Sequence, residues 1–255
     1  MKLTSRHLHQ VRGKFHKGLT LLELVVVLTI LAAIGGILLP LLPNLLTKTH
    51  VAVCTTNIPE LNKAMITFNA SNFTQPTRFD NLANGAAVWA GVPFSAVAAY
   101  TSAALTAGQA DSLIAAGITN MVQPLTTAGL SPTFAAHSVP NGAVVKTIAS
   151  ADTVLTVTKA ALNVALGGGV TIDPANTRYV IFGVGQASTL VGEKSGIFEA
   201  PVHFSDNAVG NPNNAYGRYF VVYRVLEDGS PAEFVGAAAP NENGLEGVNS
   251  HLAEF

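Results

Sequence analysis

An uncharged apolar run near the N-terminus constrains this chain more than any other feature. The 23 residues from Leu24 to Leu46 include no Asp, Glu, Lys or Arg. A helix rises about 1.5 Å per residue, so a helix of this length can cross a hydrocarbon layer of about 30 Å. The run is therefore predicted to span a membrane once.

The residues around this run set its predicted orientation. Residues 1–18 carry five Lys and Arg and no acid, whereas the rest of the chain carries nine Lys and Arg against 15 Asp and Glu. Cations that flank a span stay on the cytoplasmic side, so the N-terminus is predicted to be cytoplasmic and the bulk of the chain external. Because phosphate contacts need a basic face, no nucleic-acid partner is expected for this acidic body.

Two common export signals fit the sequence poorly. A secretory signal has an apolar core of about 7–15 residues and then a cleavage site between small residues, which Thr47–His50 does not offer. A lipoprotein signal needs a small residue before its cysteine, where this chain has Val53 before Cys54. Cys54 is the only cysteine, so it cannot form an intramolecular disulfide. It is interpreted as a small apolar residue on a helix face.

The boundary between the basic leader and the apolar run has a distinctive pattern. The leader ends in a glycine, which is followed by an apolar residue, a threonine, two apolar residues and an acid. These residues are Gly18, Leu19, Thr20, Leu21, Leu22 and Glu23. The pattern resembles the prepilin peptidase site of type IV pilins and type II secretion pseudopilins. That resemblance implies cleavage between Gly18 and Leu19 and methylation of the new terminus.

The resemblance also implies a role for Glu23 in assembly. A charge within a membrane span costs about 2.5–3.5 kcal/mol at mid-helix, so such residues tend to be functional. In filaments of this family the acid would face the new Leu19 α-amino group of a neighbouring subunit, and this charge pair would set the axial register. The alternative is a boundary residue at the lipid headgroups.

Two prolines, Pro40 and Pro43, interrupt the apolar run. Proline lacks a backbone N–H and usually kinks a helix. The resemblance implies a bend or local melting at Pro40 when subunits pack in a filament. The alternative is an ordinary kink tolerated in a membrane helix.

The helical pattern continues beyond the apolar run. The segment 57–60 (Asn-Ile-Pro-Glu) predicts a new helix start, with Asn57 as the cap and Pro59 in the first turn. Apolar residues then recur with helical spacing, which predicts a stripe packed against a head domain. They are Leu61, Ala64, Met65 and Phe68.

The stretch from Leu61 to Leu82 carries a second resemblance. An aromatic residue is followed by an asparagine, a Pro-Thr pair and a leucine. These residues are Phe68, Asn72, Pro76, Thr77 and Leu82. The stretch is similar to the end of the long helix in major type II secretion pseudopilins.

The predicted fold class is α+β: a long N-terminal helix, membrane-spanning in its first half, packed on an antiparallel β-sheet in a pilin-like head. The predicted segments are a leader over 1–18, a transmembrane and polymerisation helix over 19–46, an amphipathic continuation over 47–72 and an extracytoplasmic globular head over 73–255.

Within the head, the strand-like runs are 143–148, 153–158, 169–172, 178–184, 196–204, 218–226 and 232–235. The run around Tyr219–Tyr223 is apolar on both faces, which predicts a central strand. Residues 227–230 predict a hairpin turn after it. The Ala-rich stretches 95–107 and 108–116 are predicted to be helical or loop, and the tail from Ala237 to be loose.

No catalytic or cofactor motif stands out. The sequence has no G-x-S-x-G elbow and no Walker A loop, and its seven histidines show no zinc-ligand spacing. The segment Gly183–Gly185 follows a predicted strand but lacks the third glycine of a dinucleotide site, so it is interpreted as a turn. No enzymatic activity and no cofactor are therefore expected, with calcium as one alternative.

The calcium alternative concerns the loop 206–214, which is rich in oxygen ligands. Major pseudopilins hold a calcium ion in a C-terminal loop. Calcium takes six to eight oxygens, usually from several carboxylates, whereas Asp206 is the only carboxylate in this loop. A polar surface turn is the preferred interpretation of the loop.

These observations predict a structural subunit of a type IV pilus-like or type II secretion pseudopilus filament in the bacterial inner membrane. The expected partners are a prepilin peptidase, other pilin or pseudopilin subunits, an inner-membrane assembly platform and membrane lipid. The alternative is a single-pass anchored periplasmic binding protein or enzyme. The sequence leaves the choice between pilus and pseudopilus open.

Overall fold

The computed structural model describes residues 20–38, 42–85, 87–88, 91–123, 144–167, 176–193, 195–203, 216–241 and 243–249. The chain forms two compact units, residues 1–46 and 47–255. The described helices are α1 (Leu21–Leu38), α2 (Leu42–Asn72), α3 (Ala107–Ala115) and α4 (Lys159–Ala165). An apolar N-terminal helix and a large, mostly antiparallel sheet confirm the α+β prediction.

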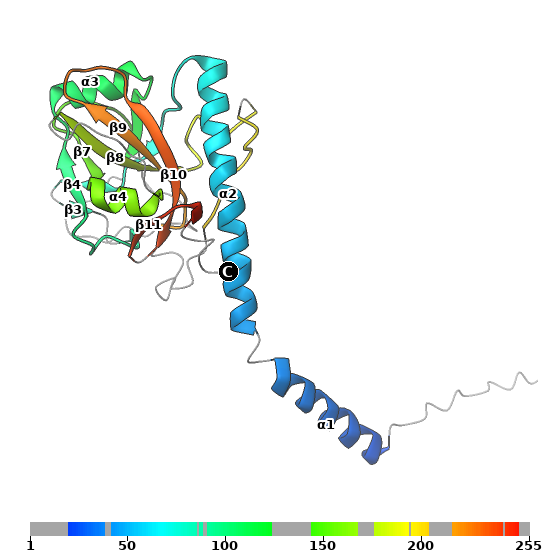
Figure 1. Ribbon diagram of the computed structural model, residues 1–255. Helices are drawn as coiled ribbons and strands as arrows, with labels where there is room; N and C mark the ends of the chain where they lie inside the picture. Colours follow the sequence, from blue (N-terminus) through cyan, green and yellow to red (C-terminus); the bar gives the residue numbers. More distant parts are fainter. Residues whose placement is uncertain are drawn as a thin grey trace, which may run out of the picture. The chain divides into compact units, whose positions relative to one another are not determined.

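Nine strands form the main sheet of the second unit (Figure 1). Their order is β11-β10-β9-β8-β1-β5-β6, and a side branch runs from β8 through β7 to β4. All neighbours are antiparallel except β1 and β5. The strands are β1 (Phe79–Asp80), β4 (Tyr100–Ala104), β5 (Asn120–Gln123), β6 (Val144–Thr147), β7 (Thr153–Val157), β8 (Thr177–Gly183), β9 (Phe220–Leu226), β10 (Glu233–Asn241) and β11 (Gly244–Glu246). A small separate hairpin pairs β2 (Ala83–Asn84) with β3 (Ala87–Val88).

Strand β9 is buried on both faces, as its sequence predicted. It lies between β8 and β10. Val221, Tyr223 and Val225 enter one core cluster, whereas Phe220 and Val222 enter another. The predicted turn at 227–230 joins β9 to β10, with Gly229 at φ +77°. Both predictions are confirmed.

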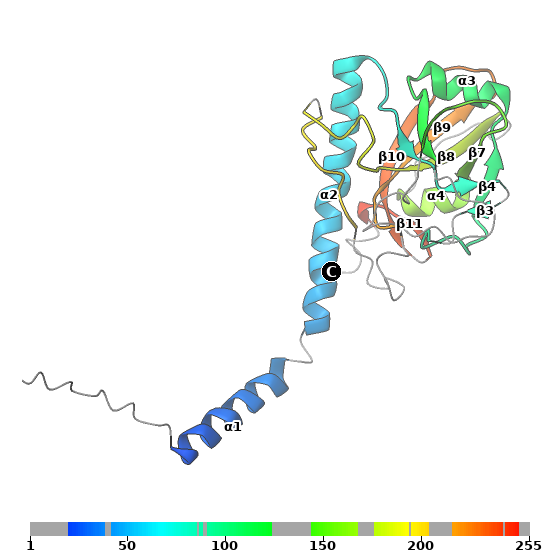
Figure 2. The ribbon, with the colours of Figure 1, turned by 180° about the vertical axis from the view of Figure 1, so that it is seen from behind.

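Helix α2 covers the first of these two faces (Figures 1 and 2). Its buried stripe is Cys54, Ile58, Leu61, Ala64, Met65 and Phe68, which confirms the predicted apolar stripe. Polar contacts fix the helix along the sheet: Asn62 Oδ1 accepts from the Ala237 N–H at 2.8 Å. Cys54 is 3% exposed, and the Tyr219 hydroxyl donates to its sulfur at 3.6 Å, so the interpretation of Cys54 as a core residue is confirmed.

The predicted helix start at residues 57–60 is wrong. Helix α2 runs without a break from Leu42 to Asn72, with Pro59 inside it. Asn57 does not cap the helix but donates from Nδ2 to the Tyr219 hydroxyl at 3.1 Å. Proline removes one backbone hydrogen bond, and the buried side chains of Ile58 and Leu61 on either side of it hold the helix on the sheet.

Three further predictions for the head are wrong in part. The run 196–204 makes only isolated bridges in its described residues, Gly192 with Ile197 and Val202 with Arg218; Gly196 has φ +77°, and Pro201 lacks the N–H that a ladder needs. The Ala-rich stretch 95–107 contains strand β4 as well as turns. The tail from Ala237 is not loose in its described residues, because β10 continues to Asn241 and β11 covers Gly244–Glu246.

The other predicted elements are found close to their predicted bounds. The runs 143–148, 153–158 and 178–184 correspond to β6, β7 and β8, and 108–116 corresponds to α3. Helix α3 begins with a capping box between Thr106 and Gln109. Helix α4 was not predicted, and the run 169–172 lies outside the described residues.

The residues that carry the second resemblance are buried or form hydrogen bonds within the second unit. Phe68 is buried on α2, and Asn72, the last residue of that helix, donates from Nδ2 to the Phe68 carbonyl at 2.9 Å. Thr77 Oγ1 donates to the Asn120 carbonyl and accepts from the Asn120 N–H, both at 2.9 Å. Pro76 is buried, and Leu82 belongs to the second core cluster.

Alanine substitutions at Met65 and at its neighbour Ile66 test whether only one face of α2 is packed in the core. Met65 is 1% exposed, whereas Ile66 is 64% exposed. We expect Met65→Ala to lower the free energy of unfolding by about 2–5 kcal/mol and Ile66→Ala to change it by less than about 0.5 kcal/mol. Denaturant unfolding followed by near-ultraviolet circular dichroism measures both; equal losses would contradict the packing of this helix.

Candidate functional site: the apolar helix and its capped start

Helix α1 is the most unusual surface of the chain. It is the one helix among the described residues that is long and apolar enough to cross a membrane. None of its residues is buried. Its large side chains are 46–82% exposed on every side of the helix, from Leu21 to Leu38. A helix that is apolar all round needs an apolar environment, which the first unit does not provide among its described residues.

Three reciprocal hydrogen bonds between Thr20 and Glu23 start this helix. Glu23 Oε2 accepts from the Thr20 N–H at 2.9 Å and from the Thr20 hydroxyl at 3.0 Å. In return, Thr20 Oγ1 accepts from the Glu23 N–H at 3.3 Å. This arrangement is a capping box, which satisfies backbone donors that the first turn of a helix leaves without partners.

The capping box adds a second role for Glu23 to the one expected from the sequence. The spacing Thr-x-x-Glu before an apolar run is the signal that could have predicted it. Both bonds that the carboxylate makes to Thr20 use Oε2. The structure therefore brings together Thr20 and Glu23, two residues of the pattern that follows Gly18.

The remaining sequence-predicted site residues are spread over the chain. Pro43 lies in the first turn of α2, where a proline costs little because the N–H groups of that turn have no partner within the helix. Gly18, Leu19, Pro40 and Asp206 lie outside the described residues. The proposed processing site, the Pro40 bend and the calcium alternative therefore remain predictions.

A buried acid that the sequence did not single out lies in the sheet of the second unit. Asp80, in β1, is 0% exposed. The Tyr216 hydroxyl donates to its Oδ2 at 2.7 Å. Burial raises the pKa of Asp80 to about 7, although the Tyr216 hydrogen bond and the charge of Arg218 both act to lower it.

Two glycines make room for this carboxyl group. A Cβ atom at Gly183 would lie 1.9 Å from the Tyr216 hydroxyl oxygen, and one at Gly185 would lie 2.1 Å from Asp80 Oδ2. The sequence placed a turn at Gly183–Gly185; Gly183 is instead the last residue of β8, and the turn follows at Gln186. The absence of a side chain at both glycines lets the Tyr216 hydroxyl and the Asp80 carboxyl group lie against the backbone.

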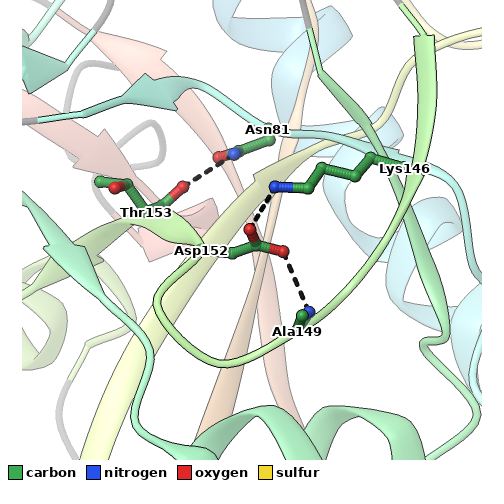
Figure 3. Close-up of polar contacts among 5 residues, drawn as sticks. All are labelled: Asn81, Lys146, Ala149, Asp152 and Thr153. Carbon is green, nitrogen blue, oxygen red and sulfur yellow. Dashed lines mark hydrogen bonds and ion pairs between the residues drawn. The ribbon is translucent and has the colours of Figure 1, made fainter.

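Further polar contacts lie beyond the end of β1, between Asn81 and β7 and within the turn from β6 to β7 (Figure 3). Asn81 Nδ2 donates to the Thr153 carbonyl at 2.8 Å. Asp152 pairs with Lys146 and accepts from the Ala149 N–H at 3.0 Å. The two Asp152 contacts close the turn between β6 and β7. In the part of the chain that the structure describes, no three His, Cys, Asp or Glu residues gather as a metal site would require.

The membrane affinity of α1 can be tested with charges. Ile30 and Ile34 lie one helical turn apart near the middle of α1 and are 53% and 48% exposed. An arginine at mid-span costs about 2.5–3.5 kcal/mol, so Ile30→Arg with Ile34→Arg should shift the full chain out of the membrane fraction after carbonate extraction and flotation. Ile66→Arg, at an exposed position of the second unit, is the control and should leave the distribution unchanged.

Comparisons with known proteins give no relative in which the cap or the apolar surface of α1 has a known role. No family model, curated protein or solved structure matches the chain.

Proposed function

We propose that the chain is a structural subunit of a type IV pilin-like filament, either a pilus or a type II secretion pseudopilus. The subunit is made as a precursor, cut between Gly18 and Leu19 by a prepilin peptidase, and held in the bacterial inner membrane by α1. One observation carries the proposal: the apolar helix, none of whose residues is buried, begins at Leu21, directly after the Gly18–Leu19 pattern and at the Thr20–Glu23 cap.

The physical basis is the need of α1 for an apolar cover. Lipid supplies that cover while the subunit is stored in the membrane. A subunit that leaves the membrane needs a replacement, because exposing apolar surface to water costs about 25 cal/mol per Å². The helices of other subunits provide one, since apolar helices associate by close packing in the absence of water.

Glu23 links processing to assembly. Cleavage creates an α-amino group on Leu19, four residues before the carboxylate. Thr20 holds Glu23 through Oε2 alone, which leaves Oε1 to accept from the amino group of a neighbouring subunit. In the apolar interior of a filament such a pair attracts strongly, and its directionality fixes how far one subunit is displaced along the next.

The proposal extends to partners and location. The N-terminus is cytoplasmic and the second unit lies in the periplasm or outside the cell, in keeping with the cations of residues 1–18. The partners are the peptidase, further pilin or pseudopilin subunits, an inner-membrane assembly platform and lipid. The rival function, an anchored periplasmic binding protein or enzyme, needs neither cleavage nor Glu23.

The processing step gives the first test. Expression of the full chain with and without a prepilin peptidase, followed by intact mass measurement and N-terminal sequencing, should give a terminus at Leu19 only when the peptidase is present, with the mass of one added methyl group. An intact Met1 terminus under both conditions would leave the rival function in place.

The assembly step gives the second test. We expect Glu23→Ala to abolish filament formation, as seen by electron microscopy of sheared cell-surface material, while the processed protein stays in the membrane fraction. The matched control is Glu60→Ala, because Glu60 is an exposed acid on α2; it should leave filaments unchanged. Normal filaments with Glu23→Ala would argue that the acid is only a helix cap.

A further inference from the structure

Strand β1 is the narrowest point of the main sheet. It has only two residues, Phe79 and Asp80, yet it joins β8 to the pair β5–β6. On one side it makes two register pairs with β5, and on the other Asp80 makes a single pair with Gly183 of β8. The connection between the β5–β6 pair and the rest of the sheet therefore passes through the residue that carries the buried acid.

The carboxyl group of Asp80 is incompletely satisfied there. Oδ2 accepts from the Tyr216 hydroxyl, but Oδ1 has no hydrogen-bond partner among the described residues. Because Phe79 belongs to the first core cluster and neighbouring strand residues alternate, Asp80 faces the second cluster, which contains Tyr216 and Phe220. A buried carboxylate with an unsatisfied oxygen is costly, whereas a neutral carboxylic acid is much less so.

We propose that Asp80 is a proton-dependent latch, which holds the β5–β6 pair to the rest of the sheet when its carboxyl group is protonated and weakens that connection when the group is ionised. This regulatory role concerns the second unit alone and is independent of the proposed filament. Local opening of a small cooperative part of a protein is common where few contacts join it to the rest.

Two titratable or charged groups face Asp80, and both act to lower its pKa against the effect of burial. Among the described residues that face its carboxyl group, the titratable or charged ones are Tyr216 and Arg218, both from the stretch before β9. The register partners from β5 and β8, Val122 and Gly183, carry no charge. Arg218 is itself buried and donates to the Ala200 carbonyl, and its charge lowers the pKa of Asp80 without cancelling the larger effect of burial.

The direction of the pH effect follows from the pKa of Asp80. Its folded value of about 7 lies above the ordinary value of 3.8, so the closed latch binds a proton that an opened, water-exposed Asp80 releases. The connection is strongest below about pH 4 and weakens as the pH rises to about 7, after which it changes no further. Within that window the opening equilibrium rises by up to about tenfold per pH unit.

Hydrogen exchange of the full chain in detergent tests the latch. Mass spectrometry follows peptides that cover β5 and β6 and peptides that cover β9 and β10, at pH 5, 6 and 7, with labelling times scaled to the intrinsic exchange rates. We expect the β5–β6 peptides to lose protection by up to about tenfold per pH unit, and the β9–β10 peptides to lose much less. Equal losses in both regions would overturn the proposal, because they would indicate a change in global stability.

Two variants identify the group responsible. Asp80→Asn has nearly the same shape and cannot ionise, so the pH dependence of the β5–β6 peptides should disappear; its persistence would overturn the proposal. Tyr216→Phe, the less disruptive change, removes only the hydroxyl that favours the ionised form. It should move the midpoint of the effect to higher pH, and an unchanged midpoint would exclude Asp80 as the latch.

Discussion

Strand β9 must be covered by apolar side chains on both faces, and the second unit is organised around that requirement. One face is covered by α2 and α3, whose buried residues share a core cluster with Tyr223 and Val225. The other is covered by α4 together with Phe94, Tyr100 and Tyr216. Because each cover is apolar and buried, neither can be removed without exposing β9 to water. Helix α2 is therefore part of the core of the second unit from Cys54 onward.

Helix α1, in contrast, is not covered by other parts of the chain among the described residues. It has the same kind of apolar side chains as the core. In the proposed filament, lipid and then neighbouring helices meet this need in turn, and one acid near the start of α1 supplies the specificity that a uniform apolar surface lacks. On this proposal, the two units rely on apolar burial in different ways: within one chain for the sheet, and with other molecules for α1.

The sequence predicted the elements whose side chains repeat with a clear period. The stripe from Leu61 to Phe68 has helical spacing, and β9 has apolar residues on both faces, so both were identified. Strand β10 was cut short and β4 was missed because they contain many alanines, which have low intrinsic β propensity and pack into strands only through tertiary contacts. Pro59 was overrated as a helix boundary, since packing on the sheet outweighs one lost hydrogen bond.

The contacts at the candidate site also differ in whether a local sequence pattern could predict them. Thr20 and Glu23 are three residues apart, so their contact could have been foreseen from a local pattern. Asp80 and Tyr216 are separated by 136 positions, and no local pattern in a single sequence indicates that they meet. The fold alone brings this acid into the sheet and shields it from water.

Cys54 gives α2 a built-in reporter. Its thiol lies between the helix and the sheet, 3% exposed and in contact with the Tyr219 hydroxyl. A water-soluble alkylating reagent can reach it only when the helix separates from the sheet, so the alkylation rate measures that separation without an added probe. The same shielding means that two folded copies cannot be cross-linked through their thiols, however closely they are packed.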